Sequence, residues 1–161
     1  MRFVAVALLL FTACAQPAAP PATPGRAMGS DVPLPRVIFP DGYAVHVELA
    51  TDDETRAQGL MYRDRLRDHT GMLFFFSEMS VHGFWMKNTL IPLDILWIDQ
   101  GRRVVHARHD VPPCQADPCP SYDPGVAAKY VLEVAAGVAR QHGVTHGSQL
   151  QFEGLDNVTV D

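Results

Sequence analysis

The side chains best suited to chemistry in this 161-residue chain are a few polar groups that interrupt apolar sequence. They are Arg63, Lys87, Asn88, Asp94 and Glu133. A carboxylate buried among apolar residues is costly unless it is paired or hydrogen-bonded. We therefore expect Asp94, which has apolar neighbours on both sides, to contact backbone donors or a cation, with Lys87 or Arg63 as the expected cation. Such a contact would either fix the register of a strand or form a polar cluster at the mouth of a pocket, to which Glu133 could add a second carboxylate.

Two carboxyl groups near a cation are compatible with acid/base catalysis. In a hydrolase-type enzyme, Asp94 or Glu133 would be the acid/base, and Lys87 or Arg63 would hold an anionic substrate. The sequence has no nucleophile elbow, phosphate-binding loop, dinucleotide fingerprint or paired-histidine metal motif that would identify a reaction. The catalytic residues therefore stay unassigned, and we expect neither a cofactor nor a metal.

Methionines and aromatic residues accompany these polar groups along the sequence. The nearest are Met61, Met72, Trp85 and Met86. Such side chains usually fill irregular apolar space in a core. Alternatively, they would line a surface for an apolar ligand, or offer sulfur to copper(I), although copper would be expected to recruit histidine or cysteine at a tighter spacing. Together with the five polar residues above, these four are the candidate ligand-binding residues.

Two cysteines, Cys114 and Cys119, lie close together in a proline-rich stretch. In an exported protein, a pair at this spacing predicts a disulfide that closes a small loop. Four intervening residues could also present two thiolates to a metal, but no second Cys or His pair with zinc spacing follows. We therefore expect the disulfide.

The first residues have the composition of a bacterial export signal. Arg2 is followed by an unbroken apolar run over residues 3–11, which is too short to span a membrane as a helix. Residues 11–14 resemble a lipobox, in which Cys14 becomes the lipidated first residue of the mature protein. Residues 13–15 also fit the small-x-small site of ordinary signal peptidase, which would remove the cysteine. We favour the lipoprotein, because the cysteine is otherwise unexplained and a tether follows it.

This N-terminal segment defines the organisation of the chain. Residues 14–35 hold six prolines among many alanines, a composition that favours extended polyproline geometry over a packed fold. We therefore predict a lipoprotein-type signal peptide over residues 1–13, a Pro/Ala-rich tether over residues 14–35 and a single folded domain over residues 36–161. The protein is expected to be exported to the periplasm or the outer membrane surface, where a lipid anchor would hold it to the membrane.

Composition and charge restrict the classes of partner. Hydrophobic residues make up 47% of the chain, which is enough to build a core, and the net charge is −5, from 13 Lys and Arg against 18 Asp and Glu. An acidic chain without a basic block argues against nucleic acid as a partner. The partners we expect are an unknown small ligand or an envelope protein, and a membrane surface through the lipid anchor.

Short apolar runs separated by turn signals dominate the predicted domain. Alternation or continuous apolar character predicts strands over residues 36–39, 43–49, 71–76, 83–86, 93–98, 104–111, 130–134 and 149–153. A helix capped by Thr51 or Asp52 is predicted over residues 53–62, and one or two helical turns over residues 135–142. This pattern predicts a mainly β fold, a compact antiparallel sandwich or barrel with one or two short helices.

Five sequence blocks in this order resemble the motifs of the domain-of-unknown-function 192 family. The blocks are Gly59-Leu60-Met61-x-Arg63, Gly71-Met72-Leu73-Phe74, Trp85-Met86-Lys87-Asn88-Thr89, Pro92-Leu93-Asp94 and Leu132-Glu133. The resemblance covers about residues 37–153. It implies a compact, mainly β domain of a kind often exported by bacteria. It implies no activity, so the motif positions are candidate site residues only.

Three functions are compatible with these observations. The first is an exported envelope domain that binds a small molecule, glycan or peptide without catalysis. The second is a hydrolase-type enzyme that uses Asp94 or Glu133, and the third is a protein-interaction module for envelope assembly. A pocket that contains both carboxyl groups would favour the enzyme, whereas an exposed apolar patch without a cavity would favour the interaction module.

Overall fold

The computed structural model describes residues 34–161, so the predicted signal peptide, most of the tether and Cys14 lie outside the described residues. The described part is mainly β, with two short helices, as the sequence predicts. In chain order the elements are β1 (Arg36–Ile38), β2 (Ala44–Ala50), α1 (Asp53–Gln58), β3 (Thr70–Ser80), β4 (Phe84–Trp85), β5 (Leu93–Ile98), β6 (Val104–Val111), β7 (Ser121–Tyr122), β8 (Ala128–Ala135), α2 (Val138–Gln141) and β9 (Gln151–Glu153). No helix within residues 34–161 has the length and apolar character needed to cross a membrane.

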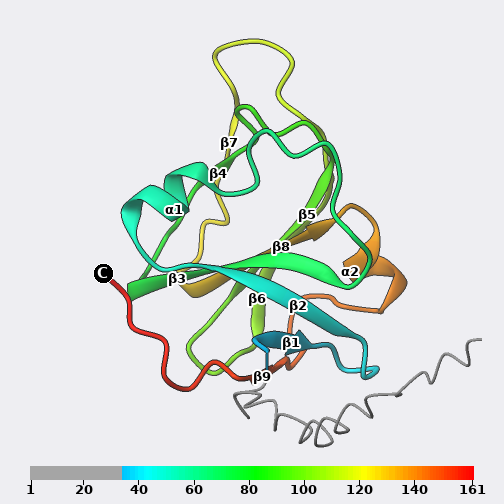
Figure 1. The fold of residues 1–161 in the computed structure, drawn as a ribbon, viewed down its shortest axis with the longest axis vertical. Helices are drawn as coiled ribbons and strands as arrows, with labels where there is room; N and C mark the ends of the chain where they lie inside the picture. Colours follow the sequence, from blue (N-terminus) through cyan, green and yellow to red (C-terminus); the bar gives the residue numbers. More distant parts are fainter. Residues whose placement is uncertain (1–33) are drawn as a thin grey trace, which may run out of the picture. The chain divides into compact units, whose positions relative to one another are not determined.

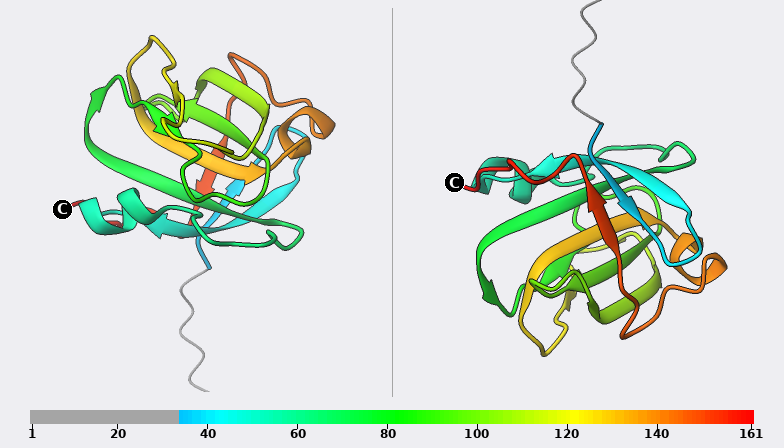
Figure 2. Two further views of the ribbon diagram at one scale, coloured as in Figure 1. Left: turned by 90° about the horizontal axis from the view of Figure 1, so that it is seen from above. Right: turned by 90° about the horizontal axis from the view of Figure 1, so that it is seen from below.

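Seven strands form one curled sheet in the order β6-β5-β8-β3-β2-β1-β9, and β4 pairs with β7 in a small second sheet (Figure 1). The curl is visible from above and below in Figure 2. All named strand pairs are antiparallel except β2 and β3, which run parallel. A parallel pair needs a crossover between its strands, and α1 lies in that crossover. The expected antiparallel sandwich or barrel is therefore a half-barrel with one parallel pair.

The two outer strands of the curled sheet, β6 and β9, approach each other near their N-terminal ends. Arg103 and Gln149 form an isolated antiparallel bridge just before these strands begin. The backbone N–H of Leu150 also donates to the carbonyl oxygen of Arg102 at 2.9 Å. These contacts hold the two edges of the sheet together at one end, so the curl encloses a core.

Apolar side chains are buried on both faces of the central strands. In β5, Leu96 and Ile98 point into the core that the curl encloses, whereas Ile95 and Trp97 point to a second core on the outer face. All six residues of β5 are buried. The segment that begins with Leu60 after α1 packs on the second core together with the β4–β7 sheet. Strands covered on both faces have continuous apolar sequences, as β5 does.

Most predicted elements are confirmed, and the departures have local causes. Strands β5 and β6 have the predicted bounds, whereas the two-residue strand β7 is too short to give a periodic signal. The helix predicted over residues 53–62 ends at Gln58, because Gly59 has a φ of 48°, in the left-handed region that ends helices. Its N-cap is Asp52, whose Oδ1 accepts the backbone N–H of Thr55 at 2.8 Å.

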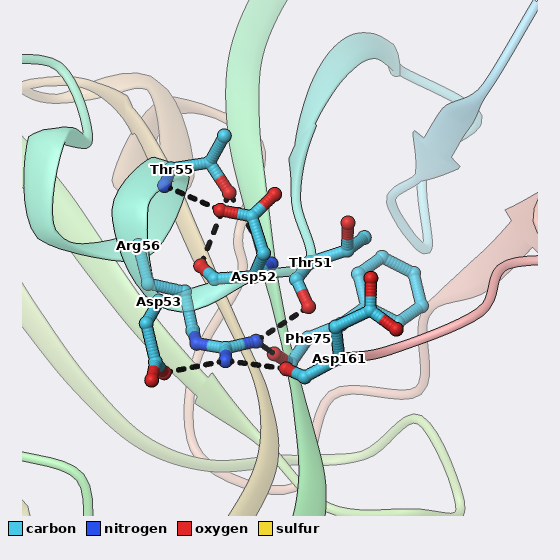
Figure 3. A network of polar contacts seen from close by, with 7 residues as sticks. All are labelled: Thr51, Asp52, Asp53, Thr55, Arg56, Phe75 and Asp161. Carbon is cyan, nitrogen blue, oxygen red and sulfur yellow. Dashed lines mark hydrogen bonds and ion pairs between the residues drawn. The ribbon is translucent and has the colours of Figure 1, made fainter.

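The guanidinium of Arg56 fixes α1 against the sheet (Figure 3). Its Nη1 donates to the carbonyl oxygens of Thr51 at 2.7 Å and Phe75 at 2.9 Å. Its Nη2 donates to Asp53 Oδ1 at 2.8 Å and to the main-chain oxygen of Asp161 at 2.7 Å. One side chain thus joins α1, β3 and the last residue of the chain.

Candidate functional site

Asp94 is completely buried, but the prediction that Lys87 or Arg63 would neutralise it is wrong. Its carboxylate accepts three backbone N–H groups, from Asp110 at 2.9 Å, Gly137 at 3.1 Å and Ala139 at 2.9 Å. Backbone donors, the other expected partner, therefore satisfy the side chain. Asp94 connects β5 to the end of β6 and to the start of α2.

A β-bulge creates the position that Asp94 occupies. Leu93 pairs with Val111 and Ile95 pairs with Arg108, so two residues of β6 face Asp94 alone. One of the two is His109, whose Nδ1 lies 3.6 Å from Asp94 Oδ2. The Asp110 N–H, which donates to the carboxylate, lies in the bulge, and the other two donors lie at the start of α2. These backbone contacts indicate a structural role for Asp94.

Arg63 and Lys87 have carboxylate partners of their own. Arg63 forms a two-point ion pair with Glu48, with Nη1–Oε1 and Nη2–Oε2 distances of 2.5 and 2.7 Å. The hydrogen bond from Arg63 lowers the pKa of Glu48. Lys87 Nζ lies 3.9 Å from Asp117 Oδ1 and 5.5 Å from the centroid of the Trp85 ring. Neither cation reaches the two buried carboxyl groups.

Asn88 fastens the segment after α1 to the segment after β4. Its Nδ2 donates to the Tyr62 hydroxyl at 2.8 Å, and its backbone carbonyl oxygen accepts the backbone N–H of Tyr62 at 2.8 Å. Both residues have a positive φ, of 56° and 63°. Asn88 Nδ2 also lies 3.8 Å from the sulfur of Met61. This clasp fixes Met61, which lines a cavity described next.

Glu133 lies near the centre of the curled sheet and faces the second core. It is opposite Ile95 of β5 and Met72 of β3, and only 4% of its surface is exposed. Burial raises the pKa of Glu133 to about 8. The side chain is therefore a neutral carboxylic acid at pH 7, able both to donate and to accept a hydrogen bond.

Glu133 lines an inner cavity of about 30 Å³, enough space for about one water molecule. Side chains around this cavity come from four of the five sequence blocks; among them are Leu60, Met61, Phe74, Trp85, Thr89 and Glu133. Met72 and Met86 are buried in the second core beside it, in agreement with the core-filling interpretation. Asp94 does not line the cavity, because it points to the opposite face of the sheet.

An outer groove of about 370 Å³ adjoins the inner cavity and shares part of its wall. Its lining includes Arg56, Phe76, Val81, His82, Phe84 and Trp85. The groove lies between α1 and the end of β3, with β4 along its side. Burial lowers the pKa of His82, so its imidazole is neutral at pH 7. The inner cavity and outer groove together form the candidate site.

The aromatic rings that line this groove differ in their exposure and in their contacts with other rings. Phe76 and His82 stack at 3.5 Å between centroids, and Phe84 packs edge-on against Phe74 at 4.9 Å. Trp85 forms no aromatic pair with any residue in the range 34–161, and half of its surface is exposed. The groove therefore has a rigid aromatic floor and one accessible indole.

Sequence reasoning named some of the site residues and missed others. Phe74 and Thr89 belong to the quoted blocks, so the position within a block was the signal that could have found them. Arg56 and His82 lie outside every block, and their roles depend on contacts between distant segments. Tertiary structure alone brings these residues to the groove.

The predicted disulfide is present. Cys114 and Cys119 are joined, with their Cα atoms 5.6 Å apart, in the loop drawn in yellow at the top of Figure 1. The loop lies against Lys87 and Asn88 and forms a separate small cavity with them. In the part of the chain that the structure describes, no three His, Cys, Asp or Glu side chains are grouped so that they could hold a metal ion.

The family model for the domain of unknown function 192, described as an uncharacterized ACR, matches residues 36–152. The chain belongs to this family. No curated protein matches the chain. The DUF192 domain is similar to a crystal structure from Sinorhizobium meliloti, whose name suggests a transcription regulator, with 36% identity and a TM-score of 0.67 over 75% of this chain and 93% of that one. It is also similar to a protein of unknown function from Novosphingobium aromaticivorans, with 30% identity and a TM-score of 0.66 over 73% of this chain and 82% of that one.

Removing the Asp94 carboxylate should destabilise the DUF192 domain. Asp94→Ala would leave three backbone N–H groups without their acceptor, and we expect the free energy of unfolding to fall by about 3–5 kcal/mol in urea denaturation. Asp94→Asn, which keeps one acceptor oxygen, should lose less. Asp156→Ala removes an exposed carboxylate that lies 3.6 Å from Arg102 and should cost less than about 1 kcal/mol. Equal stability of Asp94→Ala and wild type would contradict the structural role.

Glu133 should make the stability of the domain depend on pH. The folded protein keeps the Glu133 proton up to a pH of about 8, whereas the unfolded chain releases it near pH 4.5. Unfolding therefore releases this proton between the two values, so the free energy of unfolding should fall as the pH rises, by about 1.4 kcal/mol per pH unit from this group. Denaturation at several pH values should show that Glu133→Gln removes this contribution and that Glu54→Gln, on the exposed surface of α1, keeps it. Parallel profiles for wild type and Glu133→Gln would show that the group is not buried in its neutral form.

Proposed function

We propose that this protein is an exported envelope domain that binds a small uncharged ligand in the inner cavity and outer groove, without changing it chemically. The observation that carries the proposal is the buried Glu133 side chain, which lines a cavity together with residues of the family motifs. Burial raises the pKa of this side chain to about 8, which favours its neutral form. A concave site that combines aromatic side chains with a few convergent polar groups is typical of small-molecule binding.

The arrangement of the two carboxyl groups supports binding over hydrolysis. An acid/base pair must reach the same substrate, but Asp94 lies on the opposite face of the sheet and is held by backbone N–H groups. Arg56 is the charged residue that lines the inner cavity, and its terminal N–H groups already have acceptors. Among the residues that the structure describes, Glu133 is thus a single neutral acid without a second catalytic group beside it. It suits ligand recognition better than a reaction that needs both an acid and a base.

The neutral state of Glu133 also indicates what it recognises. A protonated carboxyl offers one donor and further acceptor capacity, so it matches a hydroxyl or another neutral polar group. A charged ligand group would lose its hydration in this cavity without an opposite charge free to compensate it. We therefore propose an uncharged ligand.

The name of the Sinorhizobium relative suggests another function, transcription regulation, and the charge of this chain opposes it. DNA binding depends on clustered Lys and Arg that neutralise phosphates. This chain has a net charge of −5, with 18 acidic against 13 basic residues, so it lacks the excess of positive charge that phosphate binding requires. Ligand binding by Glu133 is therefore the function that we favour.

Export and lipid anchoring remain part of the proposal on the evidence of the sequence. The apolar run over residues 3–11, Cys14 and the proline-rich residues 14–35 support a lipoprotein whose folded domain is held near a membrane surface.

Protein purified from its native envelope should carry a bound small molecule, detected as added mass in native mass spectrometry. Glu133→Met removes the polar group and should weaken retention about 10–100-fold, whereas Glu133→Gln keeps a donor and an acceptor and should retain the ligand. Glu54→Met, on the exposed surface of α1 outside the site, should behave like wild type. Full retention by Glu133→Met would contradict the proposed function.

The intact mass of the mature protein tests export and anchoring. We expect a chain that begins at an acylated Cys14. An unmodified chain that begins at Gln16 would support ordinary signal peptidase instead, and a chain that still contains residues 1–13 would contradict export.

A further inference from the structure

Resting on the proposed function, we infer that the ligand is an uncharged carbohydrate, with one pyranose ring stacked on Trp85 in the outer groove and one hydroxyl group directed at Glu133 and Thr89 in the inner cavity.

The indole of Trp85 is an exposed ring in the outer groove. The other rings of the groove are engaged with one another: Phe76 stacks on His82, and Phe84 packs edge-on against Phe74. Trp85 is half exposed and lines both the outer groove and the inner cavity. An exposed indole gives a flat apolar platform on which the apolar face of a ligand can stack.

The outer groove and the inner cavity differ in size. The outer groove, at about 370 Å³, has room for a ring, whereas the inner cavity, at about 30 Å³, has room only for a small substituent. A pyranose matches these two spaces. Its C–H groups form an apolar face that suits the outer groove, and a hydroxyl group projects from the edge of the ring toward the inner cavity. A bulky apolar ligand would fill the groove but would leave the polar groups of the inner cavity without partners.

Two polar side chains that line the inner cavity, Glu133 and Thr89, can form hydrogen bonds with a ligand. Glu133 is a neutral acid with donor and acceptor capacity, and the Thr89 hydroxyl lines the same cavity. The closest partner of that hydroxyl is the Lys87 carbonyl oxygen at 3.4 Å, so the Thr89 oxygen keeps its acceptor capacity. One sugar hydroxyl can accept a hydrogen bond from Glu133 and donate one to the Thr89 oxygen.

The terminal N–H groups of Arg56 are occupied by protein acceptors, which disfavours an anionic ligand. Nη1 and Nη2 of Arg56 have four terminal N–H groups, and four acceptors take them: the oxygens of Thr51, Phe75 and Asp161, and Asp53 Oδ1. No terminal N–H of Arg56 is left for a carboxylate or phosphate. Lys87 Nζ lies over the Trp85 ring, 5.5 Å from its centroid, and Lys87 lines neither of the two spaces.

Calorimetric titration of the full mature protein with neutral oligosaccharides tests the inference. The probes are chitotetraose, cellotetraose and maltotetraose, with a proline-rich peptide as the probe for a peptide ligand. We expect at least one oligosaccharide to bind. Trp85→Ala should weaken that binding about tenfold or more, which corresponds to about 1.4 kcal/mol or more, and Trp85→Phe should weaken it less, because it keeps an aromatic face.

Leu90→Ala is the matched control, because Leu90 is 57% exposed in the same segment and does not line the groove. It should bind the sugar like wild type. Binding of no oligosaccharide, or full affinity in Trp85→Ala, would overturn the inference. If the peptide or an envelope molecule binds in a Glu133-dependent manner while every sugar fails, the sugar class is wrong and the proposed function stands. If Glu133→Met also changes nothing, both fail.

Discussion

The organisation of this protein depends on a sheet whose central strands are covered on both faces. The curl encloses one core, and the segment after α1 with the β4–β7 sheet covers the other. Any polar side chain on these strands must therefore be satisfied by nearby groups or lose its charge. Two carboxyl groups, Asp94 and Glu133, lie on the covered strands, one on each face.

The two carboxyl groups meet this constraint in opposite ways. Asp94 is held by backbone N–H groups and has a structural role, whereas Glu133 is neutral and lines the candidate site. Asp94 lies at a bulge, where three backbone N–H groups stabilise its negative charge. Glu133 lies opposite Met72 and Ile95 on regular strands whose N–H groups are used by the sheet, so burial raises its pKa to about 8. A buried acid left neutral beside a cavity offers hydrogen bonds to a ligand and costs the protein stability as the pH rises.

Local sequence patterns predicted the elements, whereas long-range contacts decided the site. The apolar run of β5, the alternation in β6 and the Asp52 cap are patterns of a few residues, and the structure confirms the elements that they predicted. The sequence predicted backbone donors or a cation for Asp94. It could not identify the donors, because they lie in a bulge and at a helix start 43 or more residues away. Gly71 illustrates the same limit: a Cβ there would lie 2.5 Å from the carbonyl oxygen of Glu133, a contact between strands that the quoted block does not reveal.

The central claim is that Glu133 is a neutral acid in the folded protein at pH 7, and its most direct measurement is a carbon-13 NMR titration of the side-chain carboxyl carbon. Loss of the signal in Glu133→Gln would assign it. The account predicts that this carbon titrates with a midpoint of about pH 8. A midpoint near 4.5, the ordinary value for glutamate, would show that Glu133 is charged in the folded protein and would contradict the account.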